Sequence, residues 1–164
     1  MKITKRELKN GDIAALYNYC ARNIANEGLS AKFSLMMCKN IQALQQAFIN
    51  YQSKVYIKEL DPEWAKYTKA HNDITEKYGD RDENGNLIKD NDVVRVTEQI
   101  VEFNTANETL DNTFKEVLQR VNLSSQYNND LSQQTQEVEY VTLDLDEIPD
   151  KTPPYIVGIV LNEE

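Results

Sequence analysis

The 164-residue chain has few of the residues that interrupt regular structure or build metal sites: five glycines, four prolines, two cysteines and one histidine. So few glycines and prolines, beside many Gln, Asn, Lys and Glu residues, favour long helices over a barrel or a sandwich. The glycines are too dispersed for a P-loop or a dinucleotide-binding loop. Enzymes that cradle phosphates are therefore disfavoured. The glycines are Gly11, Gly28, Gly79, Gly85 and Gly158.

Cysteine and histidine are too sparse to predict catalysis or metal binding. Cys20 and Cys38 lie in helical patterns without CxxC spacing, so we expect reduced, partly buried thiols. His71, the sole histidine, occupies an apolar helical position, where a packed imidazole is commoner than a metal ligand. A catalytic triad would need this one residue inside a helix. We therefore expect no enzyme activity, no cofactor and no metal.

Long apolar runs are also missing. No run approaches the roughly 18 residues that a membrane-spanning helix needs. The residues Met1–Arg6 have no apolar stretch behind them that would form a secretory signal. We expect a cytoplasmic protein without membrane association.

Two apolar seams at steps of three and four residues dominate the centre of the chain, in Met37–Tyr78 and in Val93–Val121. An apolar seam with a period near 3.5 leaves water by packing against another seam. The sequence therefore predicts an antiparallel helical hairpin over residues 30–121, with its tip at residues 79–92.

Antiparallel pairing across this tip places Tyr67 near Phe103 and Trp64 near Asn107, the one polar residue in the returning seam. The indole N–H of Trp64 needs an acceptor when buried, and the side-chain carbonyl of Asn107 offers one. Either this pair fixes the register, or Asn107 lies at a solvated edge and fixes nothing.

Both ends of the chain contain β-prone segments. Met1–Lys9 alternates weakly and carries a net charge of +3, whereas Val138–Leu145 is interleaved with acids, so the two favour pairing with each other. Residues 124–136 are polar and predict a loop. Residues 155–161 fit either a helix or a strand. The predicted fold class is mainly α with a small β element (α+β): one domain over residues 1–164, with the hairpin, an N-terminal helix and a short strand pair from the two ends.

The formal net charge is −9, and Asp130–Glu164 contains nine acids against the single base Lys151. Such an acidic segment, taken as residues 137–164, repels DNA, RNA and anionic lipids, and it attracts cationic protein surfaces. Alternatively, the acids only solvate the tail. An exposed tyrosine is a common anchor at protein interfaces. The candidate partner-binding residues are Glu137, Glu139, Asp144, Asp146, Glu147 and Tyr56.

The turn at residues 80–92 is similar to the start of an EF-hand loop, with oxygen-bearing side chains at positions one, three and five and Gly85 at position six. Position twelve is Asn91, where the motif needs a bidentate glutamate. Asn84-Gly85 is also a strong turn dipeptide by itself. A calcium-binding module is therefore a distant alternative to a plain turn. The three oxygen-bearing residues are Asp80, Asp82 and Asn84.

Several segments, in order over most of the chain, resemble a family of small, functionally uncharacterised proteins of tailed bacteriophages and prophages. These segments are MKI, LSAKFSLMMCKNIQAL, KYGDRDENGN, EVEYVTLDLDEIP and IVLNEE. The resemblance implies a phage origin, action in the host cytoplasm, and either virion assembly or interference with the host. It supplies no catalytic residues.

The leading hypothesis is a non-enzymatic interaction factor that binds a host or anti-phage defence protein. In this hypothesis the acidic protein occupies a cationic, nucleic-acid-binding surface, as an anti-CRISPR inhibitor would, and does not bind nucleic acid itself. The alternative is a tail or head protein, or an assembly factor, whose helical arms form homo-oligomeric contacts.

Overall fold

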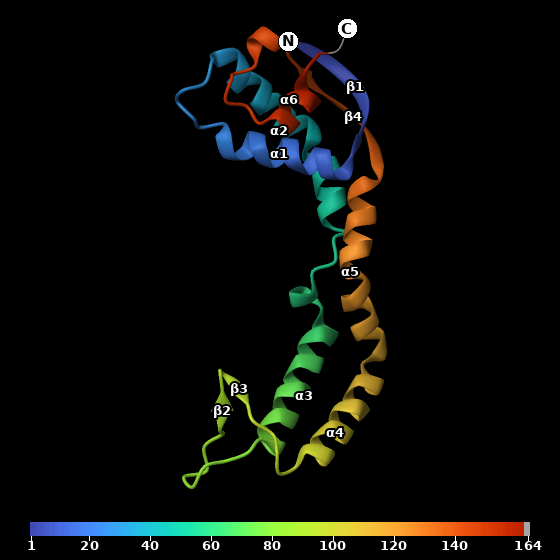
Figure 1. Ribbon diagram of the computed structural model, residues 1–164. Helices are drawn as coiled ribbons and strands as arrows, with labels where there is room; N and C mark the ends of the chain where they lie inside the picture. Colours follow the sequence, from blue (N-terminus) through green and yellow to red (C-terminus); the bar gives the residue numbers. More distant parts are fainter. Residues whose placement is uncertain (163–164) are drawn as a thin grey trace. The chain divides into compact units, whose positions relative to one another are not determined.

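The structure is a computed structural model, shown as a ribbon in Figure 1, that describes residues 1–162. Internal contacts divide the chain into two compact units. Unit 1 comprises Met1–Val55 and Gln126–Glu164, and unit 2 comprises Tyr56–Ser125. The sequence predicted one domain over residues 1–164. The two units are described separately below.

The described residues are mainly helical, with two small antiparallel sheets, so the predicted fold class is confirmed. The helix α5 begins in unit 2 and ends in unit 1. The helices are α1 (Asn10–Asn23), α2 (Ala31–Gln52), α3 (Pro62–Tyr78), α4 (Ile100–Thr113), α5 (Lys115–Gln133) and α6 (Pro154–Val160), with 3-10 turns η1 (Lys58–Leu60) and η2 (Leu145–Glu147). The strands are β1 (Lys2–Lys9), β2 (Lys89–Asp90), β3 (Val93–Val94) and β4 (Thr135–Thr142).

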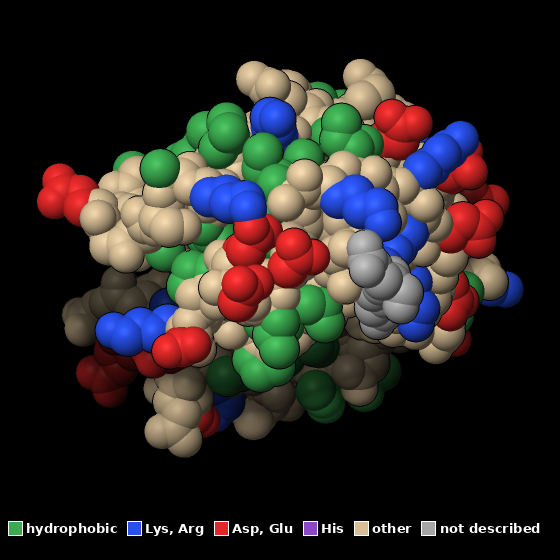
Figure 2. All heavy atoms as spheres, turned by 90° about the horizontal axis from the view of Figure 1, so that it is seen from above, with side chains coloured by type: hydrophobic (Ala, Val, Ile, Leu, Met, Phe, Trp, Pro, Cys, Tyr) green, Lys and Arg blue, Asp and Glu red, His purple; other side chains and the backbone are tan. Residues whose placement is uncertain are grey.

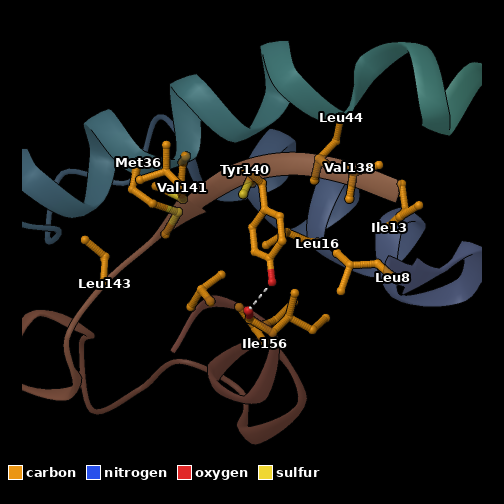
Figure 3. Close-up of a cluster of buried hydrophobic side chains, with 14 of the residues drawn as sticks. Leu8, Ile13, Leu16, Met36, Leu44, Val138, Tyr140, Val141, Leu143 and Ile156 are labelled. Atoms are coloured by element: carbon orange, nitrogen blue, oxygen red, sulfur yellow. Dashed lines mark hydrogen bonds between the residues drawn. The ribbon is translucent and has the colours of Figure 1, made fainter. Parts of the chain in front are cut away.

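In unit 1, the two ends of the chain meet as the antiparallel pair β1–β4, as the sequence predicted. The register runs from Lys2 opposite Thr142 to Lys9 opposite Thr135. One face of this sheet is covered by apolar side chains of α1, α2 and α6 (Figure 3). Buried Tyr140 lies in this core, and its hydroxyl donates to the carbonyl of Ile159 over 2.9 Å. The core therefore joins the two ends of the sequence.

The side chain of Asn40, on α2, completes the hydrogen bonding of β4. Its Nδ2 donates to the Val141 carbonyl over 3.0 Å, and its Oδ1 accepts the Val141 N–H over 2.6 Å. Asn40 is fully buried, so this amide serves in place of a neighbouring strand residue.

In unit 2, α3 and α4 pack against each other as an antiparallel hairpin. Asp61 caps α3, because its carboxylate accepts the Glu63 N–H over 2.9 Å, and Pro62 occupies the first turn. The ring of Tyr67 stacks on Trp64 at 5.3 Å between centroids and meets Phe114 edge-on at 5.8 Å. Among the described residues of unit 2, the buried large apolar side chains are Leu110 and Val117.

The tip of the hairpin is longer than the predicted 79–92, because α4 begins at Ile100. Two turns fill it. Asn84-Gly85 forms the predicted turn, with φ of 83° at Gly85, and the residues Asn91 and Asp92 join β2 to β3 with φ of 49° and 67°. A two-residue loop with positive φ at both positions matches the twist of a β-hairpin.

The predicted register of the hairpin is therefore wrong. Tyr67 lies beside Phe114 and donates to Asp111 over 2.9 Å, rather than lying near Phe103. The Oδ1 atom of Asn107 is buried and accepts no hydrogen bond from any residue in 1–162, so it does not pair with the Trp64 indole. The physical reason is that residues 93–99 continue the tip instead of α4, which shifts the returning arm along α3.

The arm predicted before the tip is also divided. The apolar face of α2, including Met36, Met37 and Leu44, packs on α1 and β4 within unit 1 instead of on the returning arm. The helix that forms the hairpin with α4 is α3.

The predicted polar loop at residues 124–136 is wrong, because α5 continues to Gln133 and β4 begins at Thr135. Its Gln, Asn and Ser residues have intermediate helix propensity, and no glycine or proline interrupts them. The helix is held by buried Leu131, whose carbonyl accepts from Asn10 Nδ2 over 2.8 Å, and by the hydroxyl of Tyr127, which donates to the Lys54 carbonyl over 3.1 Å. The open question at residues 155–161 is resolved as the helix α6.

Candidate functional site

Glu137 and Glu139 lie on the solvent-exposed face of β4. Glu137 forms an ion pair with Lys5 over 2.8 Å, and Glu139 stands directly opposite Lys5 in the register. The hydrogen bond and charge of Glu137 raise the pKa of Lys5. The cross-strand pairing of opposite charges that the sequence predicted is therefore formed.

The other three candidate acids lie around η2. Asp144 and Glu147 form a capping box, in which Glu147 accepts the Asp144 N–H over 3.3 Å. Glu147 also pairs with Lys32 and, over 3.4 Å, with the N-terminal amine of Met1. Asp146 is exposed. Asp144 and Glu147 therefore form hydrogen bonds or ion pairs within unit 1.

Tyr56 belongs to unit 2 and is half-buried. Its hydroxyl donates to Asp61 over 2.8 Å, and the Arg120 guanidinium donates to the same carboxylate oxygen over 3.0 Å. These two donors lower the pKa of Asp61 to about 2, with Tyr56 the larger cause. Burial and the bond to Asp61 raise the pKa of Tyr56. The cluster joins the start of α3 to α5.

The acids of the C-terminal segment share unit 1 with the bases of the N-terminal segment, so the net negative charge of unit 1 is small. Unit 2 has 15 acids against 9 bases, a net charge of −6, whereas unit 1 has 12 acids against 9 bases, or −3. Two of the unit 1 acids, Glu163 and Glu164, lie outside the described residues. Figure 2 shows acidic and basic side chains interspersed on the face that it presents. Two thirds of the excess therefore belongs to unit 2.

Within unit 2, several acids of α3 and of the tip are neutralised locally. Glu63 pairs with Lys66 and Asp73 with Lys69, each over 2.7 Å. Asp80 pairs with Arg95 over 3.1 Å. These acids therefore contribute little net field at the surface.

α4 differs, because the stretch from Val96 to Phe114 contains no Lys or Arg. Glu102 and Glu108 are exposed there, and among residues 1–162 neither forms an ion pair. Val101, on the same helix, is 70% exposed. Counting charge along the chain missed this surface, and the 19-residue gap between Arg95 and Lys115 was the signal that could have revealed it. The α4 outer surface consists of Val101, Glu102, Asn104, Thr105, Glu108, Thr109 and Asn112.

The acidic turn that resembles an EF-hand loop uses its carboxylates to hold its own backbone. Asp80 accepts from the N–H groups of Thr97 and Glu98 over 3.0 and 3.2 Å, and also from the Thr97 hydroxyl and Arg95. The Thr97 hydroxyl is the largest cause that lowers the pKa of Asp80 to about 2. Asp82 accepts the N–H groups of Asn84 and Asn86. These bonds occupy the oxygens that calcium would need.

The remaining chemically capable side chains are dispersed. His71 is half-buried beside the ring of Tyr67, and burial raises the pKa of the Cys20 thiol to about 12. In residues 1–162, no three His, Cys, Asp or Glu side chains are grouped so that they could hold a metal ion. No described helix has the length and apolar character to cross a membrane.

Comparison with known proteins adds no relative. No family model, no curated protein and no solved structure matches this chain.

Proposed function

We propose that this chain is a non-enzymatic, phage-encoded interaction factor that binds a cationic surface of a host or anti-phage defence protein. The contact is made by the α4 outer surface of unit 2. The partner's surface is one that otherwise holds nucleic acid, so binding inhibits the partner, as an anti-CRISPR protein inhibits its target.

One observation carries this proposal: α4 presents exposed Glu102 and Glu108 beside exposed Val101, with no base between Arg95 and Lys115. Protein interfaces combine an apolar anchor with a polar rim of complementary charge. A negative surface accelerates encounter with a positive one and repels nucleic acid. Because the C-terminal acids Glu137, Asp144 and Glu147 bond within unit 1, α4 is a better candidate than the C-terminal segment.

The proposal is tested by competition with DNA. Purified bacterial nucleic-acid-binding proteins, including RNA-guided nucleases, are first bound to fluorescein-labelled DNA. The chain is then titrated in while the anisotropy of the DNA is followed. We expect displacement from at least one of these proteins at about 0.05 M salt and much weaker displacement at about 0.5 M, where charges are screened.

Two matched variants locate the surface. Glu102→Gln with Glu108→Gln removes two charges from α4, and Glu137→Gln with Glu139→Gln removes two from β4. We expect the α4 variant to displace DNA about tenfold less well and the β4 variant to act like the parent chain. Failure to displace DNA from any protein tested, or equal loss in both variants, would contradict the proposal.

A second candidate function is a structural or assembly role in the phage particle. It is favoured by the exposure of large apolar side chains on unit 2, where buried apolar contact with further copies would stabilise a thin hairpin. It predicts self-association that hardly changes with salt, measured by sedimentation velocity. The exposed side chains are Ile57, Leu60, Val93, Ile100, Val101 and Leu123.

A further inference from the structure

The two-stranded sheet of unit 1 has two outer edges, and the edge formed by β4 is closed at one end. Both backbone groups of Val141 bond to the Asn40 side chain. Two positions further along, the Leu143 N–H donates to the Val160 carbonyl and its own carbonyl accepts from Asn162, each over 2.8 Å. Hydrogen bonds within the chain therefore satisfy the outward-facing backbone groups at Val141 and Leu143.

The same bonds reveal which groups of β1 face outward. In an antiparallel pair, opposite residues either exchange both hydrogen bonds or point both groups away from each other. Val141 points its groups away from β1, so its opposite residue Ile3 points its N–H and C=O away from β4. By the same alternation, the N–H and C=O groups of Lys5 and Glu7 also point outward.

Nothing in the described part of the chain covers this outer edge of β1. No backbone hydrogen bond within residues 1–162 joins Ile3, Lys5 or Glu7 to a group beyond the β1–β4 pair. Ile3 is 70% exposed, and the Lys5 side chain is 57% exposed. Figure 1 shows β1 as the outer strand of the pair. An uncovered row of backbone donors and acceptors is a template for one more strand.

The charge of β1 selects the kind of strand. The solvent-exposed face of β1 presents Ile3, Lys5, Glu7 and Lys9. Lys5 already pairs with Glu137 across the sheet, whereas Lys9 stands opposite the uncharged Thr135. Over its whole length β1 has a net charge of +3, so a second copy would bring two positive strands together, and like charges on neighbouring strands repel. A segment with acidic side chains beside Lys5 and Lys9, an uncharged one beside Glu7 and an apolar one beside Ile3 complements the edge.

We propose that the outer edge of β1 binds an extended segment of a partner protein that places acidic side chains beside Lys5 and Lys9 and an apolar side chain beside Ile3. The segment joins the sheet through the N–H and C=O groups of Ile3, Lys5 and Glu7. This site lies in unit 1 and does not depend on the proposed function of α4.

The experiment uses the full chain and the fluorescein-labelled heptapeptide Glu-Thr-Thr-Thr-Glu-Thr-Val. In antiparallel pairing its glutamates lie beside Lys9 and Lys5 and its valine lies beside Ile3. We expect saturable binding by anisotropy that weakens with salt. Two control peptides have lysine in place of glutamate, or N-methyl groups on alternate amides, which block strand pairing. We expect both controls to bind about tenfold or more weakly. If the N-methylated peptide bound as tightly as the unmodified glutamate peptide, the proposal would be overturned.

Two variants of Lys5 distinguish the effect of its side-chain charge from the effect of its backbone N–H. The Lys5 N–H faces outward, so Lys5→Pro removes an edge donor and leaves the β1–β4 hydrogen bonds in place. Lys5→Ala removes the same charge and keeps the donor. We expect the proline variant to lose about tenfold more affinity than the alanine variant, at unchanged circular dichroism. Equal affinities, or a dimer of the parent chain that Lys5→Pro abolishes, would overturn the acidic-segment proposal.

Discussion

Asn40 and Val141 are 101 residues apart in sequence and bond to each other twice, through the Nδ2 and Oδ1 atoms of one side chain and the C=O and N–H of one backbone unit. Both residues are buried. Asn40 therefore ties α2 to the sheet and prevents β4 from pairing further at this position. The side-chain amide of Asn40 thus makes the two backbone hydrogen bonds that a third strand would make with Val141.

Replacing Asn40 tests this relationship. Asn40→Leu keeps the branched shape of the side chain but leaves the N–H and C=O of Val141 buried without partners, which costs about 3 kcal/mol of unfolding free energy. Urea unfolding followed by circular dichroism measures the loss, and hydrogen exchange of the Val141 amide should accelerate. The control Gln45→Leu, at an exposed position of α2, should change the free energy by less than about 0.5 kcal/mol. Equal effects of the two substitutions would contradict the role of Asn40.

Two glycines give opposite predictions for the same substitution. A Cβ at Gly79 would lie 2.6 Å from Val94 Cγ1, 2.7 Å from Leu87 Cδ2 and 2.9 Å from the Thr75 carbonyl. We expect Gly79→Ala to destabilise unit 2 by about 2 kcal/mol, which fluorescence of the single tryptophan reports.

A Cβ at Gly158, inside α6, meets nothing within 4 Å. Gly158→Ala should therefore stabilise unit 1 by about 0.5–1 kcal/mol, since alanine loses less backbone entropy in a helix. Circular dichroism during urea unfolding measures it. A destabilised Gly158→Ala or a neutral Gly79→Ala would show that the packing around these positions is misassigned.

Unit 2 should lose stability in acid. The pKa of Asp80 is lowered from 3.8 to about 2, so its stabilising contribution is complete above pH 4 and is lost as the pH falls toward 2. Asp61 titrates in the same range. Carboxyl NMR titration measures both pKa values directly. Asp80→Asn should flatten the pH dependence of unfolding over this range, and an Asp80 pKa near 4 would contradict the hydrogen bonding described for the tip.

Calcium should not stabilise the chain. The oxygens of Asp80 and Asp82 already accept hydrogen bonds from the tip's own backbone, so binding a cation would break them. We expect the melting temperature to stay within about 1 °C in millimolar calcium, where a folded EF-hand loop would bind. A larger, saturable increase would restore the calcium-binding alternative.

Local signals in the sequence located much of the fold. The cap at Asp61 with Pro62 gave the start of α3, and Asn84-Gly85 gave the first turn of the tip. Opposite charges on the two ends of the chain gave the β1–β4 pair. These features depend on neighbouring residues or on simple charge balance, so they can be read without tertiary contacts.

The features that sequence reasoning missed depend on long-range contacts. Apolar periodicity shows that α2 has a buried face but not that this face packs on β4 rather than on the returning arm. The role of Asn40 depends on a strand 101 residues away. Likewise, the tip extends to residue 99 because Asp80 bonds to Thr97 and Glu98. Linear charge counting finds the acids of the C-terminal segment but does not show that Lys5 pairs with Glu137 and Lys32 with Glu147 in the fold.

Hydrogen–deuterium exchange of the chain bound to a cationic partner, identified by the DNA displacement assay, tests the location of the contact most directly. The account predicts that binding slows exchange in peptides from Ile100–Thr113 and leaves Thr135–Thr142 unchanged, and that Glu102→Gln with Glu108→Gln removes the protection. Protection confined to Thr135–Thr142 and the acids around η2, with α4 unaffected, would contradict it.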